Sequence, residues 1–131
     1  MLGAFFYYLN LLASPFISRH WPQNRNIESK NTESNSLKWI QYSEEKFNLA
    51  LKSRKPIIID FYADWCAACE QLEQNTFSHA QVKALASDFA FIKFDATSES
   101  PELTKLREKY SLVGLPTIIF ISSSGVWLKE L

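Results

Sequence analysis

The sequence predicts an α/β fold in which helices flank a mixed central sheet. Three observations support this class. Residues 57–62 and 89–94 are almost continuously apolar, which is typical of strands buried on both faces. Segments rich in helix-forming residues lie between the apolar runs. A third apolar run, residues 117–121, is followed by a Ser-Gly turn, so the expected order is βαβαβαββ.

The first half of the expected domain contains two strands joined by a helix. Residues 37–42 are typical of a short strand, and Ser43 can cap a helix whose first turn is acidic. The Arg-Lys-Pro break at residues 54–56 ends that helix. The next strand, residues 57–62, is expected at the centre of the sheet because its apolar run is continuous.

The second half alternates helices with strands and closes with a hairpin. Residues 67–74 favour a helix, and Ser78 with Gln81 forms a capping-box pattern for a further short helical piece. Ser100 is followed by proline and glutamate, which marks the start of another helix. Residues 126–131, after the Ser-Gly turn, are expected to form an antiparallel edge strand.

The composition predicts one folded domain and no nucleic-acid partner. The 131 residues are 47% hydrophobic, which is enough for a single core of ordinary size. Lysine and arginine total 14, and aspartate and glutamate also total 14. Because the charges balance, no broad attraction to a phosphate backbone is expected.

The chain divides into three parts by composition. Residues 1–17 are hydrophobic, residues 18–36 are a polar linker, and the folded domain is expected over residues 37–131. The hydrophobic segment is interpreted as a membrane anchor or the remnant of a longer helix, with a signal peptide or an unstructured tail as alternatives. Arg19 and Arg25 follow it and favour a cytoplasmic position for that side, which counts against an exported domain.

The two cysteines, Cys66 and Cys69, carry the chemistry that the sequence suggests. They follow a buried strand and open a helix, where unpaired backbone N–H groups and the helix dipole stabilise negative charge. A thiolate is the attacking species in disulfide exchange. Three positions along a helix bring Cys69 beside Cys66, so we expect Cys66 to be the nucleophile and Cys69 the resolving thiol.

Other uses of this cysteine pair are less well supported. Tetrahedral zinc needs four ligands, and the chain offers only His20 and His79 besides the two cysteines, so no metal site is expected. A purely structural disulfide would close a very short loop, which removes little chain entropy. The sequence has no Gly-rich phosphate-binding loop, so we expect no organic cofactor and a redox-active Cys66–Cys69 disulfide alone.

The motifs resemble those of a known family. The run Asp-Phe-Tyr-Ala-Asp-Trp-Cys-Ala-Ala-Cys at residues 60–69, with Gly-Leu-Pro-Thr at residues 114–117, resembles the thioredoxin superfamily. Within it, the segment from residue 37 to 128 is most similar to the periplasmic domains that follow a membrane-embedded electron carrier in bacterial thiol:disulfide interchange proteins. The hydrophobic segment and linker ahead of the domain fit that arrangement.

This resemblance implies a thioredoxin-like fold and a protein-disulfide reductase that passes electrons by dithiol–disulfide exchange. The implied partners are protein thiols and disulfides: a membrane electron-donor domain and a periplasmic acceptor domain. The implied location is the bacterial inner membrane, with the domain facing the periplasm. Two alternatives stay open, a free-standing oxidase or isomerase with the same fold and a module that binds client proteins without turnover.

The resemblance also assigns substrate-binding residues. Pro116 lies in the family's cis-proline position, which implies that it sits opposite the cysteine pair. A cis bond after Leu115 would leave the preceding backbone free to pair with an extended substrate chain. Without the family, the same proline would be interpreted as an ordinary turn at the start of a strand. Trp65 is expected to shield the site and offer a contact surface, with plain packing as the alternative.

Two acidic residues complete the predicted site. Asp60 is the lone charge in its apolar run and matches the buried acid of the family, so its pKa should be raised and it can exchange a proton with Cys69. The alternative is a strand-end aspartate bonded to backbone. Glu73 lies on the helical face of both cysteines, where it either tunes the thiol pKa values or is simply solvated.

Two departures from the family pattern limit what can be carried over. The residues between the cysteines are Ala67 and Ala68, without the proline of typical thioredoxins, so the reduction potential and the direction of electron flow stay open. The sequence also lacks the final helix that covers one face of the sheet in the family.

Overall fold

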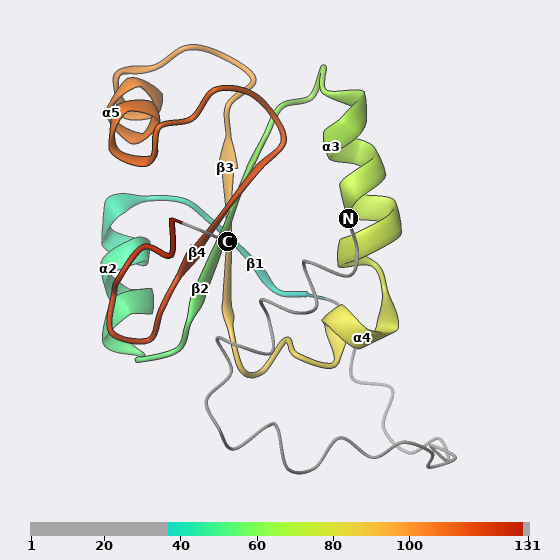
Figure 1. Ribbon diagram of the computed structural model, residues 1–131, viewed down its shortest axis with the longest axis vertical. Helices are drawn as coiled ribbons and strands as arrows, with labels where there is room; N and C mark the ends of the chain where they lie inside the picture. The colour runs from blue at the N-terminus through green and yellow to red at the C-terminus, as the bar shows by residue number, and fades with distance from the viewer. Residues whose placement is uncertain (1–36, 130–131) are drawn as a thin grey trace.

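The computed structural model describes residues 37–129 as one sheet with helices on both of its faces (Figure 1). In chain order the elements are β1 (Trp39–Gln41), α2 (Glu44–Lys52), β2 (Ile57–Tyr62), α3 (Ala67–Leu72), its π-helical continuation η1 (Glu73–Phe77), α4 (Ala80–Lys83), β3 (Ala90–Asp95), α5 (Pro101–Tyr110) and β4 (Thr117–Ile121). The strands lie in the order β1-β3-β2-β4. β3 runs parallel to β1 and β2, and β4 is antiparallel to β2, so the predicted mixed sheet is confirmed.

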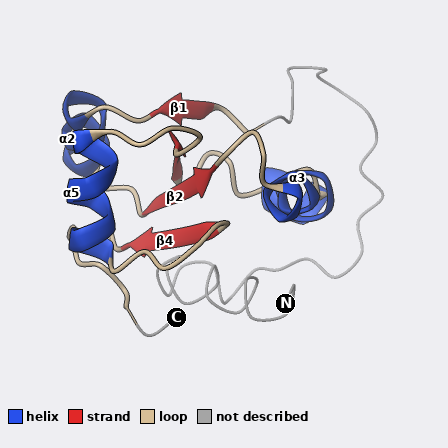
Figure 2. Cartoon of the chain, turned by 90° about the horizontal axis from the view of Figure 1, so that it is seen from above, coloured by secondary structure: helices blue, strands red, loops and turns tan. Residues whose placement is uncertain are grey.

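Alternate residues of β2 pack against two different helical layers. The first layer is formed by α2 and α5, which lie together on one side of the sheet, while α3 lies on the other (Figure 2). Ile57, Ile59 and Phe61 are fully buried in the core under α2 and α5. Ile58 is fully buried in the second core, which includes Phe77 at the end of η1. Burial on both faces explains the continuous apolar run of this strand.

Two of the predicted helix starts are confirmed by their capping contacts. Ser43 is the N-cap of α2, where its side chain accepts a hydrogen bond from the Lys46 N–H. Ser100 is the N-cap of α5 and accepts from the Leu103 N–H, with Pro101 as the first helical residue. Both serines have extended backbone angles, as an N-cap requires.

Removing the cap of α5 should cost measurable stability. Ser100→Ala leaves the Leu103 N–H without its acceptor at 3.0 Å, so we expect a loss of about 1 kcal/mol in the free energy of unfolding. Urea unfolding followed by circular dichroism measures the change. Ser98→Ala, at an exposed position two residues earlier, is the matched control and should differ little from the wild type. Equal losses in the two variants would contradict a capping role.

Two local features differ in detail from the predictions. The helix after the cysteines does not stay α-helical: from Glu73 it widens into η1, where the Ser78 N–H donates to the Glu73 carbonyl. The next short helix, α4, is capped by His79, whose Nδ1 accepts from the Gln81 N–H, and not by the predicted Ser78. A helix as short as α4 is positioned mainly by packing, here of Val82, which is fully buried.

The C-terminal edge strand forms only in part. An isolated antiparallel bridge joins Trp127 to Ile121, and the Leu128 N–H donates to the Phe120 carbonyl at 2.9 Å. The predicted strand over residues 126–131 is therefore reduced to a bridge, and residues 130–131 lie outside the described part. Up to residue 129, no helix follows β4.

The expectations for the N-terminal parts lie outside the described residues. These are the hydrophobic segment at residues 1–17 and the polar linker at residues 18–36. Within residues 37–129, none of the helices combines the length and apolar character that crossing a bilayer requires.

Candidate functional site

The two cysteines form a disulfide at the start of α3. Their Cα atoms are 5.3 Å apart, and both residues are only 8% exposed. Cys66 is the N-cap of the helix, and its sulfur accepts a hydrogen bond from the Cys69 N–H at 3.2 Å. The first turn of the helix therefore directs a backbone donor at the sulfur of Cys66, which favours negative charge on that atom once the bond is reduced.

Asp60 lies in β2, six residues before Cys66, and is buried. Only 4% of the residue is exposed, and burial raises the pKa of its carboxyl from 3.8 to about 7, as the sequence predicts. The positive charge of Lys93 opposes this increase in pKa, and the negative charge of Glu73 adds to it. Among the described side chains, Asp60 Oδ1 is a buried oxygen with no hydrogen-bond partner. The carboxyl is thus able to take up or release a proton near neutral pH.

Lys93 belongs to this site, although the sequence analysis did not single it out. It is the Cα partner of Asp60 in the parallel pairing of β2 with β3. Its Nζ lies 2.6 Å from Glu73 Oε2 and 4.6 Å from the centre of the Trp39 ring. The signal that could have revealed it is the one that revealed Asp60, because Lys93 is the lone charge in the apolar run at residues 89–94.

A small cavity joins the acidic residues to the disulfide. Its volume is about 260 Å³, and its lining includes both cysteines, Asp60, Glu73 and Lys93. The structure thus brings together the four residues predicted as catalytic. The Glu73 carboxylate is in an ion pair with Lys93, and its side chain is 46% exposed, so both expectations for Glu73 stay predictions.

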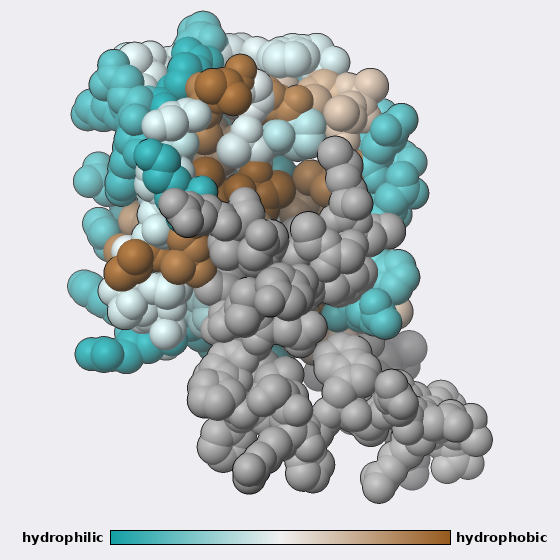
Figure 3. All heavy atoms as spheres, in the orientation of Figure 1, coloured by the Kyte–Doolittle hydropathy of each residue, from teal (hydrophilic) through white to brown (hydrophobic). Residues whose placement is uncertain are grey.

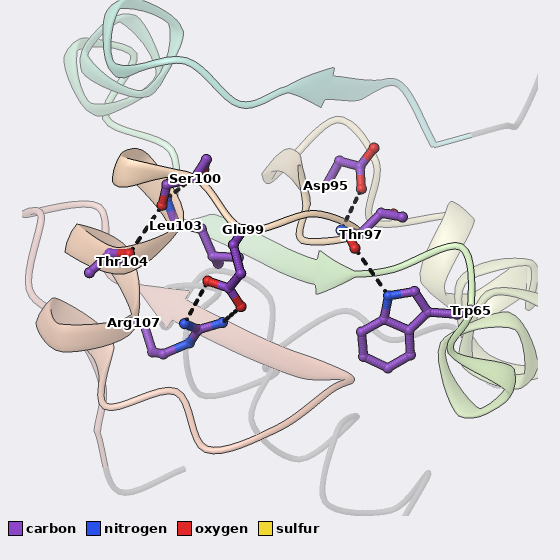
Figure 4. Close-up of polar contacts among 8 residues, drawn as sticks. All are labelled: Trp65, Asp95, Thr97, Glu99, Ser100, Leu103, Thr104 and Arg107. Carbon is purple, nitrogen blue, oxygen red and sulfur yellow. Dashed lines mark hydrogen bonds and ion pairs between the residues drawn. The ribbon is translucent and has the colours of Figure 1, made fainter.

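The segment before the disulfide is held by the loop that follows β3. The Trp65 indole Nε1–H donates to the Thr97 carbonyl at 3.1 Å, and the Asp64 N–H donates to Thr97 Oγ1 at 3.0 Å. Thr97 is held in turn by Asp95, whose Oδ1 accepts its N–H at 2.9 Å (Figure 4). With this anchor Trp65 stays 68% exposed and is not packed in the core.

The proline loop lies against the same site. The Leu115–Pro116 peptide bond is cis, as the family resemblance implies. Leu115 packs against the cluster formed by Ala63 and the two cysteines. β4 begins at Thr117, whose Cα partner is Phe61 near the end of β2. Antiparallel pairing with the strand that leads to the disulfide therefore brings this loop to the cysteines.

The described residues contain no metal-binding cluster. Within residues 37–129, no group of three or more His, Cys, Asp or Glu side chains is arranged to hold an ion. The chemistry that the arrangement supports directly is dithiol–disulfide exchange, with a proton-exchanging carboxyl beside it.

The burial of Asp60 should make the disulfide-bonded domain less stable as the pH rises. Between pH 3.8 and about 7 the folded state binds this proton more tightly than the unfolded state, so the free energy of unfolding falls over that interval and levels off above it. Asp60→Asn removes this contribution. The stability difference between variant and wild type should grow by up to about 4 kcal/mol in favour of the variant between pH 4 and 8.

Urea titrations of both proteins across that range measure the difference. Asp88→Asn makes the same chemical change at an exposed position before β3 and should follow the wild type at every pH. If the difference between Asp60→Asn and wild type stayed constant with pH, Asp60 would not be the buried titrating group.

The chain is similar to known thioredoxin-like proteins in its sequence. A family model described as thioredoxin-like matches residues 38–123. The thiol:disulfide interchange protein DsbD of Photorhabdus laumondii is 45% identical over 73 residues, which cover 56% of this chain and 13% of that protein. DsbD of Haemophilus ducreyi is 32% identical over 116 residues, 88% of this chain and 20% of that protein. The chain thus spans one fifth or less of the length of these relatives.

The fold is also similar to those of solved structures from this family. The C-terminal domain of Neisseria meningitidis DsbD in its oxidised form aligns with a TM-score of 0.58 at 30% sequence identity, covering 67% of this chain and 78% of that domain. A thioredoxin from Thermus thermophilus aligns with a TM-score of 0.56 at 26% identity, covering 70% of each chain. Both similarities include the arrangement of strands and helices described above.

Proposed function

Because this chain belongs to the thioredoxin-like family, we propose that it is a thiol:disulfide oxidoreductase that works as a protein-disulfide reductase. The observation that carries the proposal is the Cys66–Cys69 disulfide at the start of a helix, next to a buried acid with a pKa of about 7. This combination provides a nucleophile, a resolving thiol and a proton acceptor within one small cavity. The DsbD relatives are named thiol:disulfide interchange proteins, which supports the exchange chemistry.

The first step is attack by the reduced domain on a partner disulfide. The thiolate of Cys66, stabilised by the N–H of Cys69, attacks one sulfur of the partner. A mixed disulfide forms between Cys66 and the partner, the partner's own S–S bond breaks, and the departing sulfur takes up a proton. Cys66 thus acts as the nucleophile.

The second step releases the partner. Asp60 accepts the proton of Cys69, and the resulting thiolate attacks the sulfur of Cys66. The Cys66–Cys69 disulfide forms, the mixed disulfide breaks, and the partner leaves with two thiols. The domain has lost two electrons and two protons, and the partner has gained both. Glu73 and Lys93, which line the same cavity, set the charge around Asp60 during this transfer.

The partners and the location are part of the same proposal. By its likeness to DsbD, the domain receives electrons from a membrane domain and passes them to a periplasmic acceptor domain, and it faces the periplasm at the bacterial inner membrane. The hydrophobic residues 1–17 support such a tether.

Trapping the mixed disulfide tests the reaction. Cys69→Ala removes the resolving thiol, so the reduced variant should remain covalently bound to a protein disulfide substrate such as insulin, through Cys66. Non-reducing electrophoresis and mass spectrometry of the adduct detect the bond. Cys66→Ala is the matched control and should form no adduct. A folded Cys69→Ala variant that traps no substrate would refute the proposal.

The direction of electron flow has its own measurement. Equilibration of the domain with glutathione redox buffers gives its reduction potential. A reductase should lie below the glutathione poise of about −220 to −260 mV, whereas an oxidase or isomerase should lie above it. A potential well above that range would contradict the proposed reductase activity. It would not contradict the more general proposal of thiol:disulfide exchange.

A further inference from the structure

A second groove, separate from the acidic cavity, is lined in part by Trp65. Its volume is about 320 Å³, and its lining also includes Thr97, Arg107, Val113 and Leu115. The cysteines do not line this groove, but Leu115 packs against the cluster that contains both of them. The groove therefore lies beside the disulfide, where part of a reacting partner can bind.

The two sides of this groove carry exposed apolar surface. Trp65 is 68% exposed, and Val113 is fully exposed. The other large hydrophobic side chains that the described part of the chain exposes, Leu49 and Val126, do not line this groove. Figure 3 shows apolar surface where the loop between α5 and β4 crosses the molecule. An apolar patch of this kind beside a reactive group is typical of a protein-binding surface.

The positive charge in the groove is already neutralised. Arg107 donates two hydrogen bonds to Glu99, from Nη2 to Oε1 at 2.9 Å and from Nη1 to Oε2 at 3.0 Å (Figure 4). This paired geometry satisfies one edge of the guanidinium with a carboxylate from the same chain. The charge of Arg107 is therefore balanced within the groove.

Unpaired negative charge lies beside the groove at Thr97. Asp64 and Asp95 are both exposed, and each is hydrogen-bonded to Thr97, which lines the groove. Asp64 also lines the acidic cavity that contains the disulfide. Across residues 37–129 the ion pairs are Lys93 with Glu73 and Arg107 with Glu99, so neither of these aspartates has a basic partner. The border that a partner meets is therefore acidic.

We propose that this groove selects partner segments that place an apolar side chain beside the reacting cysteine and a lysine or arginine next to it. The apolar side chain lies between Trp65 and Val113, and the basic side chain lies against Asp64 and Asp95. The inference rests on the proposed function and adds to it the chemistry of the preferred partner. Charge complementarity at the border should act mainly on the association rate.

Three peptides that differ at one position test this selection. Each contains Leu, a single Cys and then Lys, Gln or Glu, with the cysteine capped by 2-mercaptoethanol as a neutral mixed disulfide. The reduced domain attacks this disulfide through Cys66, releases the two thiols and ends as the Cys66–Cys69 disulfide. Quenched reactions analysed by mass spectrometry give the second-order rate constants. Bis(2-hydroxyethyl) disulfide, which is small and uncharged, serves as the reference substrate.

The Lys peptide should react about fivefold faster than the Glu peptide at low ionic strength, with the Gln peptide between them. The ratio should approach one in about 1 M salt, where the screening length is only about 3 Å. The Asp64→Asn, Asp95→Asn double variant should also bring the ratio toward one. Asp88→Asn, which removes one negative charge at the opposite end of β3, should leave the ratio unchanged.

The apolar part of the groove is tested separately. Val113→Ser should lower the rate constants of all three peptides relative to that of the reference disulfide. Equal rates for the Lys and Glu peptides at low salt, or a faster Glu peptide, would overturn the inference while leaving the proposed function intact. A reduced domain that attacks neither the peptides nor the reference disulfide would overturn both.

Discussion

Cys66→Ser should abolish disulfide exchange, with a loss of about a thousandfold or more in the rate of insulin reduction. Cys66 supplies the sulfur that both forms and breaks the mixed disulfide, and a serine hydroxyl cannot take its place because oxygen does not form that bond. The serine can still accept the Cys69 N–H, so the start of α3 should be preserved. Turbidity assays with a chemical reductant measure the rate.

Cys69→Ser provides the comparison that separates the two sulfurs. This variant keeps the attacking thiolate and should still form mixed disulfides, although it should not release the partner by internal attack. The urea midpoint of the reduced forms of both variants should stay close to that of the reduced wild type. Appreciable insulin reduction by folded Cys66→Ser would show that Cys69 or another group starts the reaction.

The second large effect is expected in the core, where Phe61→Ala should lower the free energy of unfolding by about 3–5 kcal/mol. Phe61 is fully buried near the end of β2. Its ring centre lies 5.4 Å from that of Phe94 and 6.3 Å from that of Tyr110, so truncation opens a cavity between the sheet and α5. Chemical denaturation of the oxidised protein gives the loss.

Phe61→Leu is the matched control for this cavity. Leucine keeps most of the apolar volume, so its loss should be clearly smaller than that of alanine. The exposed Val113 offers a further comparison, because Val113→Ala removes no buried surface and should change stability little. Equal losses for Phe61→Ala and Phe61→Leu would show that the site relaxes around the missing ring.

The elements that the sequence predicted well are those whose signals are local. The runs at residues 57–62 and 117–121 match β2 and β4 in both bounds, because strands covered on both faces need continuous apolar residues. Ser43 and Ser100 were identifiable as caps since one side chain and one backbone donor define each contact.

The features that were missed depend on how distant segments pack. The π-helical turn from Glu73 and the cap at His79 follow from the fit of this segment against the sheet, which no local pattern expresses. The edge strand predicted over residues 126–131 is only a bridge within the described residues, because the apolar residues after the turn do not determine how far pairing with β4 continues. Tertiary packing decides all three.

In the candidate site, too, some residues are predicted from local sequence signals and others depend on how distant segments pack. The cysteine spacing and the burial of Asp60 follow from the chain around them, and both predictions agree with the structure. Lys93 and Thr97 join the site through strand register and a loop contact. A single sequence does not show which residues of β3 align with those of β2. The contacts of Lys93 and Thr97 with the site are therefore known only from the structure.

The central position of β2 also determines how the domain can move. This strand is hydrogen-bonded to β3 on one side and β4 on the other, and it leads directly to the segment that carries the disulfide. Its amide protons should consequently exchange with solvent only through the rarest, nearly global opening events. The cysteine sulfurs therefore follow a strand that opens only rarely, so each partner disulfide finds them in the same position.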